Sequence, residues 1–201
     1  MTSLALTLAS LALPVSLEER LDQFSELFRK WNRSINLSAA RTEPELREHI
    51  VDSLHVVPHL RAAHASGHPA TMSVLDVGAG GGLPAVIAAL SLPDAHITAL
   101  EPVRKKHAFL RAAVRELALP NLDPRAERLD EHAHRDYAAA MSRATFDLRD
   151  WLELGCARVR PGGIVLGFEA ILRRDLPSDI ERHPYALDDR SRAIVLLRRS
   201  P

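Results

Sequence analysis

The run Val-Leu-Asp-Val-Gly-Ala-Gly-Gly-Gly-Leu-Pro, from residue 74 to residue 84, constrains the fold more than any other part of the sequence. Residues 73–77 are suited to a short buried strand, and residues 78–82 form a glycine-rich turn. Pro84 then starts a helix, where a missing N–H costs nothing. Glycines permit positive φ angles and let a ligand approach backbone N–H groups closely. A strand, a glycine turn and a helix in this order predict a ligand site at the carboxyl edge of a sheet.

The spacing of the glycines separates two classes of ligand. A dinucleotide fingerprint, Gly-x-Gly-x-x-Gly, fails because Leu83 stands where the third glycine would fall when counting from Gly78. Asp76, Gly78, Gly80 and Gly82 instead give Asp-x-Gly-x-Gly-x-Gly, the spacing of methyltransferase motif I. An acid entering the turn suits a cationic sulfonium that carries an amino group, and it is poorly placed for a pyrophosphate. The turn therefore favours S-adenosyl-L-methionine (SAM).

Strand and helix patterns alternate after this turn. We expect strands that include residues 96–100, end near 125, and cover 138–142, 164–168 and 193–197, with helices over 104–117 and 147–159. Glu101 ends the second strand, where an acid can accept hydrogen bonds from a ribose diol. The alternation predicts an α/β fold with a mainly parallel sheet and helices on both faces.

A helical period precedes the glycine turn. Capping boxes, Ser16 with Glu19 and Thr42 with Glu45, each stand before an apolar run at helical spacing. Residues 1–14 are apolar without a preceding positive charge, which favours a docked or frayed helix over a secretory signal.

The position of a histidine-rich, small-residue stretch sets the expected boundary between two parts of the chain. This stretch covers residues 62–71 and is expected to be a linker. We therefore expect an N-terminal helical cap and linker over residues 1–68 and a SAM-binding methyltransferase domain over residues 69–201.

Composition narrows the class of protein. Apolar residues make up 46% and the formal net charge is zero, which indicates a globular chain and argues against a general nucleic-acid coat protein. Cys156, the single cysteine, fits a reducing cytoplasm and excludes an internal disulfide. It is expected to be a packed thiol, which weighs against a cysteine-dependent cytosine-C5 mechanism. No later segment reaches the ~18 apolar residues of a membrane span.

Outside motif I, short elements match one known family in colinear order, from about residue 16 to about residue 165. The sequence resembles the RsmG (GidB) family of 16S ribosomal RNA guanine-N7 methyltransferases. The matching elements are Trp31-Asn32, Ile35-Asn36-Leu37-Ser38, His49-Ile50-Val51-Asp52-Ser53-Leu54, Gly82-Leu83-Pro84, Lys105-Lys106 with Phe109-Leu110, Arg125-Ala126-Glu127 and Ser142-Arg143-Ala144.

The resemblance implies a class I (Rossmann-like) SAM-dependent methyltransferase fold and a set of site residues. Glu101 would hold the ribose hydroxyls, while Ala126 and Glu127 would flank the adenine. Arg143 would be the catalytic residue, beside the transferred methyl and the RNA. The implied cofactor contacts are Asp76, Gly78, Gly80, Gly82, Leu83, Glu101, Ala126, Glu127 and Arg143.

The resemblance also implies that Asn36, His49 and Asp52 tie the helical cap to the cofactor pocket. The residues themselves leave alternatives open. His49, Asp52 and Ser53 share one helix face, which a structural hydrogen-bond cluster explains as well as catalysis does. A metal site is disfavoured because no second pair of ligands is placed to complete it. Asn32 and Asn36 could instead cap the end of the first long helix.

The implied reaction agrees with the lack of an obvious catalytic dyad. Guanine N7 has a lone pair and no proton, so its methylation needs no general base, and the base must be unpaired or splayed out to be reached. The expected partner is 16S ribosomal RNA or the small ribosomal subunit, with a monomeric enzyme. Basic residues that could contact phosphates, or form a solvated face, are Arg29, Lys30, Arg33, Arg41, Arg104, Lys105 and Lys106.

Two departures from the family pattern concern the target. Phe168-Glu169 stands where the family usually carries lysine-glycine, and we expect this acid to remove a cation that could face RNA. Ala138 replaces an acid before the fourth strand. A related methyltransferase acting on another RNA or a small molecule, or a non-catalytic SAM-binding paralogue, are the alternative functions.

Overall fold

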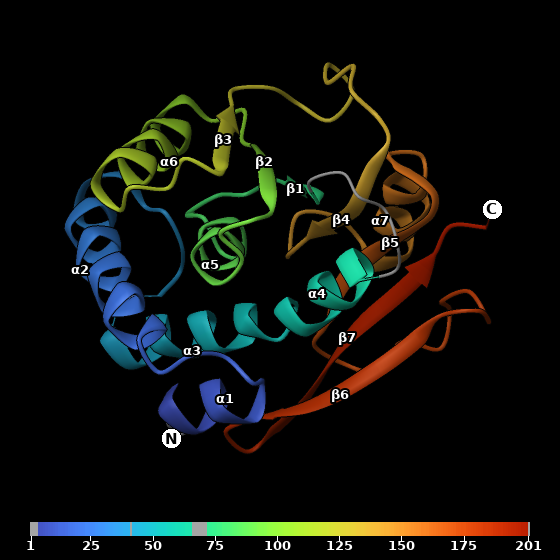
Figure 1. Ribbon diagram of the computed structural model, residues 1–201, viewed down its shortest axis with the longest axis horizontal. Coiled ribbons are helices and arrows are strands. Elements are labelled where there is room, and N and C mark those ends of the chain that lie inside the picture. Colours follow the sequence, from blue (N-terminus) through green and yellow to red (C-terminus); the bar gives the residue numbers. More distant parts are fainter. Residues whose placement is uncertain (1–3, 41, 66–71, 201) are drawn as a thin grey trace.

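A seven-stranded sheet forms the centre of the computed structural model, which describes residues 4–40, 42–65 and 72–200. The strand order is β3-β2-β1-β4-β5-β7-β6; the first five strands are parallel, and β7 is antiparallel to both its neighbours (Figure 1). The predicted α/β fold with a mainly parallel sheet is confirmed. The strands are β1 (Ser73–Val77), β2 (His96–Leu100), β3 (Leu122–Arg125), β4 (Tyr137–Ser142), β5 (Val159–Glu169), β6 (Glu181–Leu187) and β7 (Arg190–Arg198).

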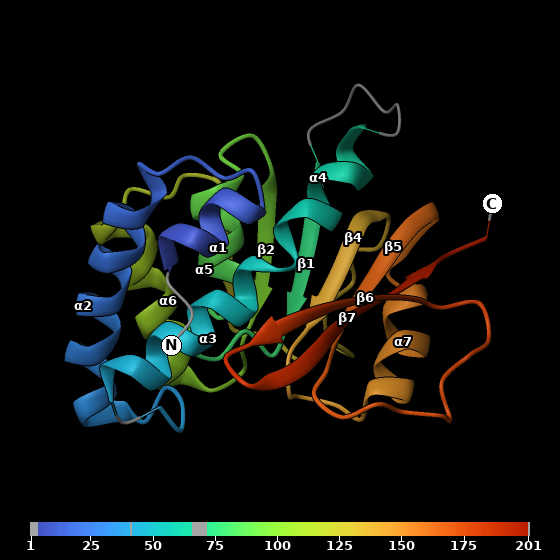
Figure 2. The ribbon, with the colours of Figure 1, turned by 90° about the horizontal axis from the view of Figure 1, so that it is seen from below.

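Helices cover the two faces of the sheet unequally. Buried side chains of α1 to α6 share one hydrophobic cluster with one face of the sheet, and α7 packs on the other face (Figure 2). Segments 126–136 and 170–180 connect consecutive strands without a helix. The helices are α1 (Leu4–Ser10), α2 (Leu17–Ile35), α3 (Glu43–Leu54), α4 (Val57–Ala65), α5 (Ala85–Ser91), α6 (Arg104–Glu116) and α7 (Leu148–Cys156).

The central strands are buried on both faces because their side chains alternate between two clusters. Val74 packs in the cluster beneath α1 to α6, while its neighbour Leu75 packs with Trp151 of α7. Successive strand residues point to opposite faces, so a strand covered on both sides is apolar throughout. This requirement explains why the bounds expected for β1 and β2 agree with the structure.

An aromatic cluster joins the N-terminal helices to the sheet. The ring centroids of Phe28 and Trp31, both on α2, lie 5.8 and 5.9 Å from that of Phe109 on α6. Leu8 of α1 is fully buried, so this short helix is docked, as expected. One hydrophobic cluster includes residues on both sides of residue 68; the division into two domains there stays a prediction.

The two predicted capping boxes have different outcomes. At α3 the box is confirmed: Glu45 N donates to Thr42 Oγ1 at 3.4 Å, and Thr42 N donates to Glu45 Oε2 at 3.0 Å. At α2 the Ser16–Glu19 box is wrong, because the Ser16 backbone is already helical and its side chain makes no capping bond. The N–H of Leu17 donates instead to the carbonyl of Pro14, so a backbone turn starts this helix.

Other elements differ from the predicted ones because contacts between distant parts of the chain set their ends. The helix expected to reach Val159 ends at Cys156, because β5 already begins at Val159 and contains the Pro161–Gly163 turn as an irregularity opposite β4. Strand β6 was not expected: its side chains are mostly exposed or half-buried, and Pro184 suits its place at the sheet edge. Helix α4 takes up the start of the expected linker, and residues 66–71 lie outside the described part of the chain.

No helix among the described residues is both long and apolar enough to cross a membrane.

The capping box at α3 gives a stability prediction with an internal control. We expect Thr42→Ala to lower the free energy of unfolding by about 1 kcal/mol, because the Glu45 N–H loses its side-chain acceptor. Ser16→Ala should change it by less than about 0.5 kcal/mol, since Ser16 makes no capping bond. Urea unfolding of both variants measures this, and equal losses would contradict the assignment of the caps.

Candidate active site

The glycine-rich turn lies at the carboxyl ends of β1 and β2. Gly78, Gly80 and Gly82 have φ angles of 74°, 55° and 79°, which favour glycine over any residue with a Cβ. The N–H groups of Gly78 and Ala79 donate to the carbonyl of Leu100, so the turn is folded onto the end of β2. Helix α5 begins at Ala85, one residue after the expected start, with Pro84 as its N-cap.

Asp76 is a buried acid without a hydrogen-bond partner among the described residues. Its side chain is fully buried and neither carboxylate oxygen is bonded. Burial raises the pKa of Asp76 to about 7, although the Ala85 backbone N–H and the Arg143 guanidinium favour the charged form. A buried, unpaired carboxyl group beside a glycine turn is costly, and a cationic ligand would compensate it.

Glu101 has the opposite environment. Its two carboxylate oxygens accept hydrogen bonds from the N–H groups of Gly80 and Val103, each at 2.8 Å. The side chain is therefore fixed at the end of β2, where the sequence predicts an acid that holds a ribose diol. Each oxygen keeps a further lone pair for another donor.

A cleft of about 410 Å³ adjoins the glycine turn; we call it the β1–β2 cleft. Glu127, predicted to flank an adenine, lines it, and its carboxylate lies 2.7 Å from Nδ1 of His132. Nε2 of His132 lies 2.7 Å from the Tyr137 hydroxyl, so this histidine positions Glu127. The lining residues are Val77, Gly78, Leu100, Pro102, Glu127, Arg128, Leu129, Asp130, Thr145, Phe146, Leu154 and Arg158.

The predicted cofactor residues are only partly gathered in this cleft. Gly78 and Glu127 line it, whereas Ala126 is exposed and is not among the lining residues. Asp76 and Glu101 are buried at the strand ends. The apolar wall formed by Leu100 and other side chains was not expected, because its members lie on separate elements that sequence spacing does not relate.

A second cleft, of about 340 Å³, lies at the carboxyl ends of β4 and β5; we call it the β4–β5 cleft. Phe146 lines both clefts, so the two adjoin. Helix α3 and strands β6 and β7 supply the outer wall. The lining residues are Glu48, His49, Asp52, Ser142, Arg143, Ala144, Phe146, Leu148, Trp151, Phe168, Glu169, Ala170, Tyr185, Leu187, Arg190 and Arg192.

Arg143 connects the helical cap, the glycine turn and the sheet. Its Nη1 donates to Asp52 Oδ2 at 3.2 Å, and its Nε donates to the carbonyl of Leu83 at 3.2 Å. The Tyr185 hydroxyl donates to the other Asp52 oxygen at 2.6 Å, while the Tyr185 ring stacks on His55 with centroids 3.8 Å apart. Asp52 thus links α3 to Arg143. The resemblance implied a link between the cap and the pocket at this residue, and the bonds among Asp52, Arg143 and Tyr185 also form a structural cluster.

His49 and Asn36 do not take part in that link. His49 lines the β4–β5 cleft, and its Nδ1 is buried without a hydrogen-bond partner among the residues that the structure describes. Burial lowers the pKa of His49. Asn36 is the left-handed C-cap of α2, the alternative that helix capping offered. Asn32 accepts from the N–H groups of Leu37 and Ser38, so it orders the turn after that helix.

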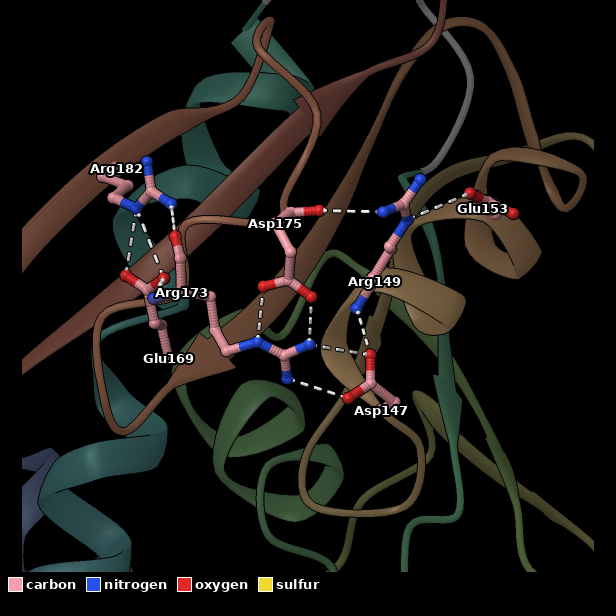
Figure 3. Close-up of polar contacts among 7 residues, drawn as sticks. All are labelled: Asp147, Arg149, Glu153, Glu169, Arg173, Asp175 and Arg182. Carbon is pink, nitrogen blue, oxygen red and sulfur yellow. Dashed lines mark hydrogen bonds and ion pairs between the residues drawn. The ribbon is translucent and has the colours of Figure 1, made fainter.

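Two further expectations concern Glu169 and Cys156. Glu169 was expected to remove a cation that could face RNA; in the fold its side chain is 3% exposed and pairs with Arg182 at 3.1 Å (Figure 3). It also accepts from the N–H of Arg173, so it serves the loop that follows β5. Burial raises the pKa of the Cys156 thiol, which agrees with a packed thiol and disfavours a nucleophile.

The raised pKa of Asp76 predicts a pH-dependent stability. Between about pH 4 and pH 7 the folded state holds a proton that the unfolded state releases, so stability falls as the pH rises through this window. Asp76→Asn removes that proton equilibrium. We therefore expect wild-type protein to lose on the order of 2 kcal/mol more unfolding free energy than Asp76→Asn between pH 5 and pH 8.

Urea unfolding at several pH values measures this difference. Asp94→Asn is the matched control, since Asp94 is an exposed acid and its variant should follow the wild-type profile. Parallel profiles for wild type and Asp76→Asn would contradict a raised pKa.

Solved structures share this fold at low sequence identity. The magnesium protoporphyrin IX methyltransferase from Synechocystis PCC 6803 with bound SAM has a TM-score of 0.60 and 12% identity, covering 88% of this chain and 97% of that one. The tRNA (m1A58) methyltransferase from Aquifex aeolicus has a TM-score of 0.55 and 13% identity, covering 75% and 68%. The class I methyltransferase fold is thereby confirmed.

Sequence relatives are more specific. "Ribosomal RNA small subunit methyltransferase G" from Bordetella avium (strain 197N) is 40% identical over 154 residues, 76% of this chain and 67% of the relative. The protein of the same name from Aromatoleum aromaticum is 34% identical over 210 residues, 96% of each chain. The model of the GidB family, described as rRNA small subunit methyltransferase G, matches residues 17–176. The chain belongs to this family of ribosomal RNA small subunit methyltransferases.

Proposed function

We propose that this protein transfers a methyl group from SAM to N7 of a guanine in 16S ribosomal RNA. The observation that carries the proposal is the pair of adjoining clefts, one beside the glycine turn and one beside Arg143. Membership of the family supports the ribosomal substrate. A SAM site and a base site that meet at Phe146 are the arrangement that direct methyl transfer requires.

The acids at the ends of β1 and β2 and the lining of the adjoining β1–β2 cleft together fit SAM. The unpaired carboxyl group of Asp76 suits a cationic ligand, and Glu101 is fixed where it can accept from ribose hydroxyls. Leu100 and Leu129 give the cleft an apolar wall for the adenine, with Glu127 held nearby by His132. SAM supplies an activated methyl group on a sulfonium when it is bound.

The residues of the β4–β5 cleft orient the guanine. Guanine presents O6 beside N7 on the same edge, and Arg143 has N–H donors beyond its bonds to Asp52 and Leu83. A guanidinium donor to O6 would direct N7 toward the neighbouring cleft. N7 carries no proton, so no base is needed, and the methylated guanine is cationic.

Exposed cations at the same edge of the sheet could contact the RNA backbone. The end of α2 carries Lys30 and Arg33, and the start of α6 carries Arg104 and Lys105, all exposed. Trp31 packs on Phe109 and brings these two helices together. We propose that this surface binds phosphates. Arg29, of the same predicted group, pairs with Glu43, and Arg41 lies outside the described residues.

We further propose that the enzyme acts as a monomer in the cytoplasm, without a metal. The alternatives, another RNA or a small molecule as substrate and a non-catalytic paralogue, have less support because the family model and Arg143 with its partners are both retained. Sedimentation equilibrium would test the monomer.

Methyl transfer from labelled SAM to small ribosomal subunits from cells lacking this protein tests the function. We expect label at one guanine, mapped by strand cleavage at N7-methylguanine. Glu101→Gln should weaken SAM binding by roughly 10- to 100-fold, because a charged acceptor is lost. Arg143→Ala should reduce methyl transfer by at least ~100-fold in protein that remains folded by circular dichroism.

Three results would contradict parts of this proposal. Label confined to small molecules would favour the small-molecule alternative, and label in another RNA would replace 16S ribosomal RNA as the target. Tight SAM binding without transfer to any acceptor would indicate the non-catalytic paralogue.

A further inference from the structure

The loop after β5 presents two neighbouring apolar side chains to solvent. Ile171 is 81% exposed and Leu172 is 66% exposed, more than most large apolar side chains of the described chain. The residue before them, Ala170, lines the β4–β5 cleft. The apolar pair, which we call the apolar tip, therefore stands at the mouth of the cleft assigned to the guanine.

An ion-pair network fixes the loop that carries the apolar tip (Figure 3). Arg173, directly after the tip, binds Asp147 at 2.8 Å and Asp175 at 2.6 Å through its guanidinium. Its N–H donates to Glu169, and its carbonyl accepts from Arg182 at 2.6 Å. Both flanks of the tip are thus tied to the start of α7 and to the sheet. The apolar tip is therefore exposed on a loop that these contacts hold in place.

Arginines lie on both sides of the apolar tip. Arg174 is exposed next to the tip, while Arg190 and Arg192 line the adjacent cleft, where Arg190 pairs with Glu48. Arg192 also donates to the carbonyl of Ala170 at 2.7 Å, so one of these cations is fixed at the base of the tip. Apolar side chains among arginines complement nucleic acid, because bases offer apolar faces and phosphates offer negative charge.

A guanine stacked in folded RNA must leave its stack before N7 can be reached, which costs free energy. Proteins that unstack bases insert aliphatic side chains between neighbouring bases. We propose that Ile171 and Leu172 are a wedge that takes the place of a neighbouring base beside the target guanine and holds the guanine in the β4–β5 cleft. This inference rests on the proposed function, since it assigns the wedge to the RNA substrate.

The double variant Ile171→Ala/Leu172→Ala tests the wedge. With small ribosomal subunits as substrate, we expect kcat/KM to fall by about tenfold or more, with the SAM dissociation constant and the urea midpoint unchanged. Ile171→Leu/Leu172→Met should keep activity, because the contact needs apolar bulk. Leu6→Ala/Val15→Ala is the matched control: both residues are similarly exposed but lie at α1 and before α2, and neither lines the cleft.

Photocrosslinking tests directly whether the apolar tip contacts the RNA. A photoreactive benzoylphenylalanine at position 171 should crosslink 16S ribosomal RNA within a few nucleotides of the methylated guanine. Wild-type activity in the double alanine variant, or crosslinks far from that guanine, would overturn the wedge while leaving the methyltransferase function in place. Loss of binding to phosphatidylglycerol vesicles in the double variant, with methyl transfer unchanged, would assign the tip to a membrane surface instead. A wild-type enzyme inactive on 16S ribosomal RNA would contradict both proposals.

Discussion

The ion pair between Arg143 and Asp52 holds the two halves of the site together. Both side chains are largely buried, at 17% and 15% exposed, and they join the end of β4 to α3. Leu83 and Tyr185 supply the remaining hydrogen bonds, so neither charge is left without a partner. Removing one member of such a pair leaves the other charge buried and unpaired, which is strongly destabilising. The position of α3, and with it one wall of the β4–β5 cleft, therefore depends on Arg143.

The two acids at the strand ends, Glu101 and Asp76, have different environments and therefore different roles. Glu101 is saturated by backbone N–H donors and has a fixed geometry. Neither oxygen of Asp76 is hydrogen-bonded within the described part of the chain, and burial keeps the carboxyl group partly protonated near neutral pH. A site that holds an uncompensated carboxyl group is less stable without a cationic ligand, and it selects for one. Glu101 thus supplies an acceptor at a fixed position, and Asp76 supplies a carboxyl group that can pair with a cationic ligand.

Local sequence patterns predict part of the fold and part of the site. The bounds of β1 and β2, the glycine turn, and Glu101 at the strand end follow from strand burial and from glycine chemistry, which act over a few residues. The clefts do not, because Phe146 meets Leu129 in one cleft and Tyr185 in the other only when separate strands pair. Glu169 illustrates the limit: its place in the motif predicts the loss of a cation, but it does not predict that the side chain is buried against Arg182. Strand β6 escaped prediction because an edge strand needs few apolar residues.

Several site residues come from loops on the face of the sheet that carries few helices. On the face that carries only α7, segments 126–136 and 170–180 replace helices and supply Glu127, His132 and the apolar tip. A crystal structure with S-adenosylhomocysteine and a guanine-containing RNA would test directly whether the two clefts form one reaction centre. We expect the cofactor product in the β1–β2 cleft and the guanine in the β4–β5 cleft, with N7 facing the sulfur beside Arg143. A guanine bound elsewhere, or a cofactor product in the β4–β5 cleft, would contradict this expectation.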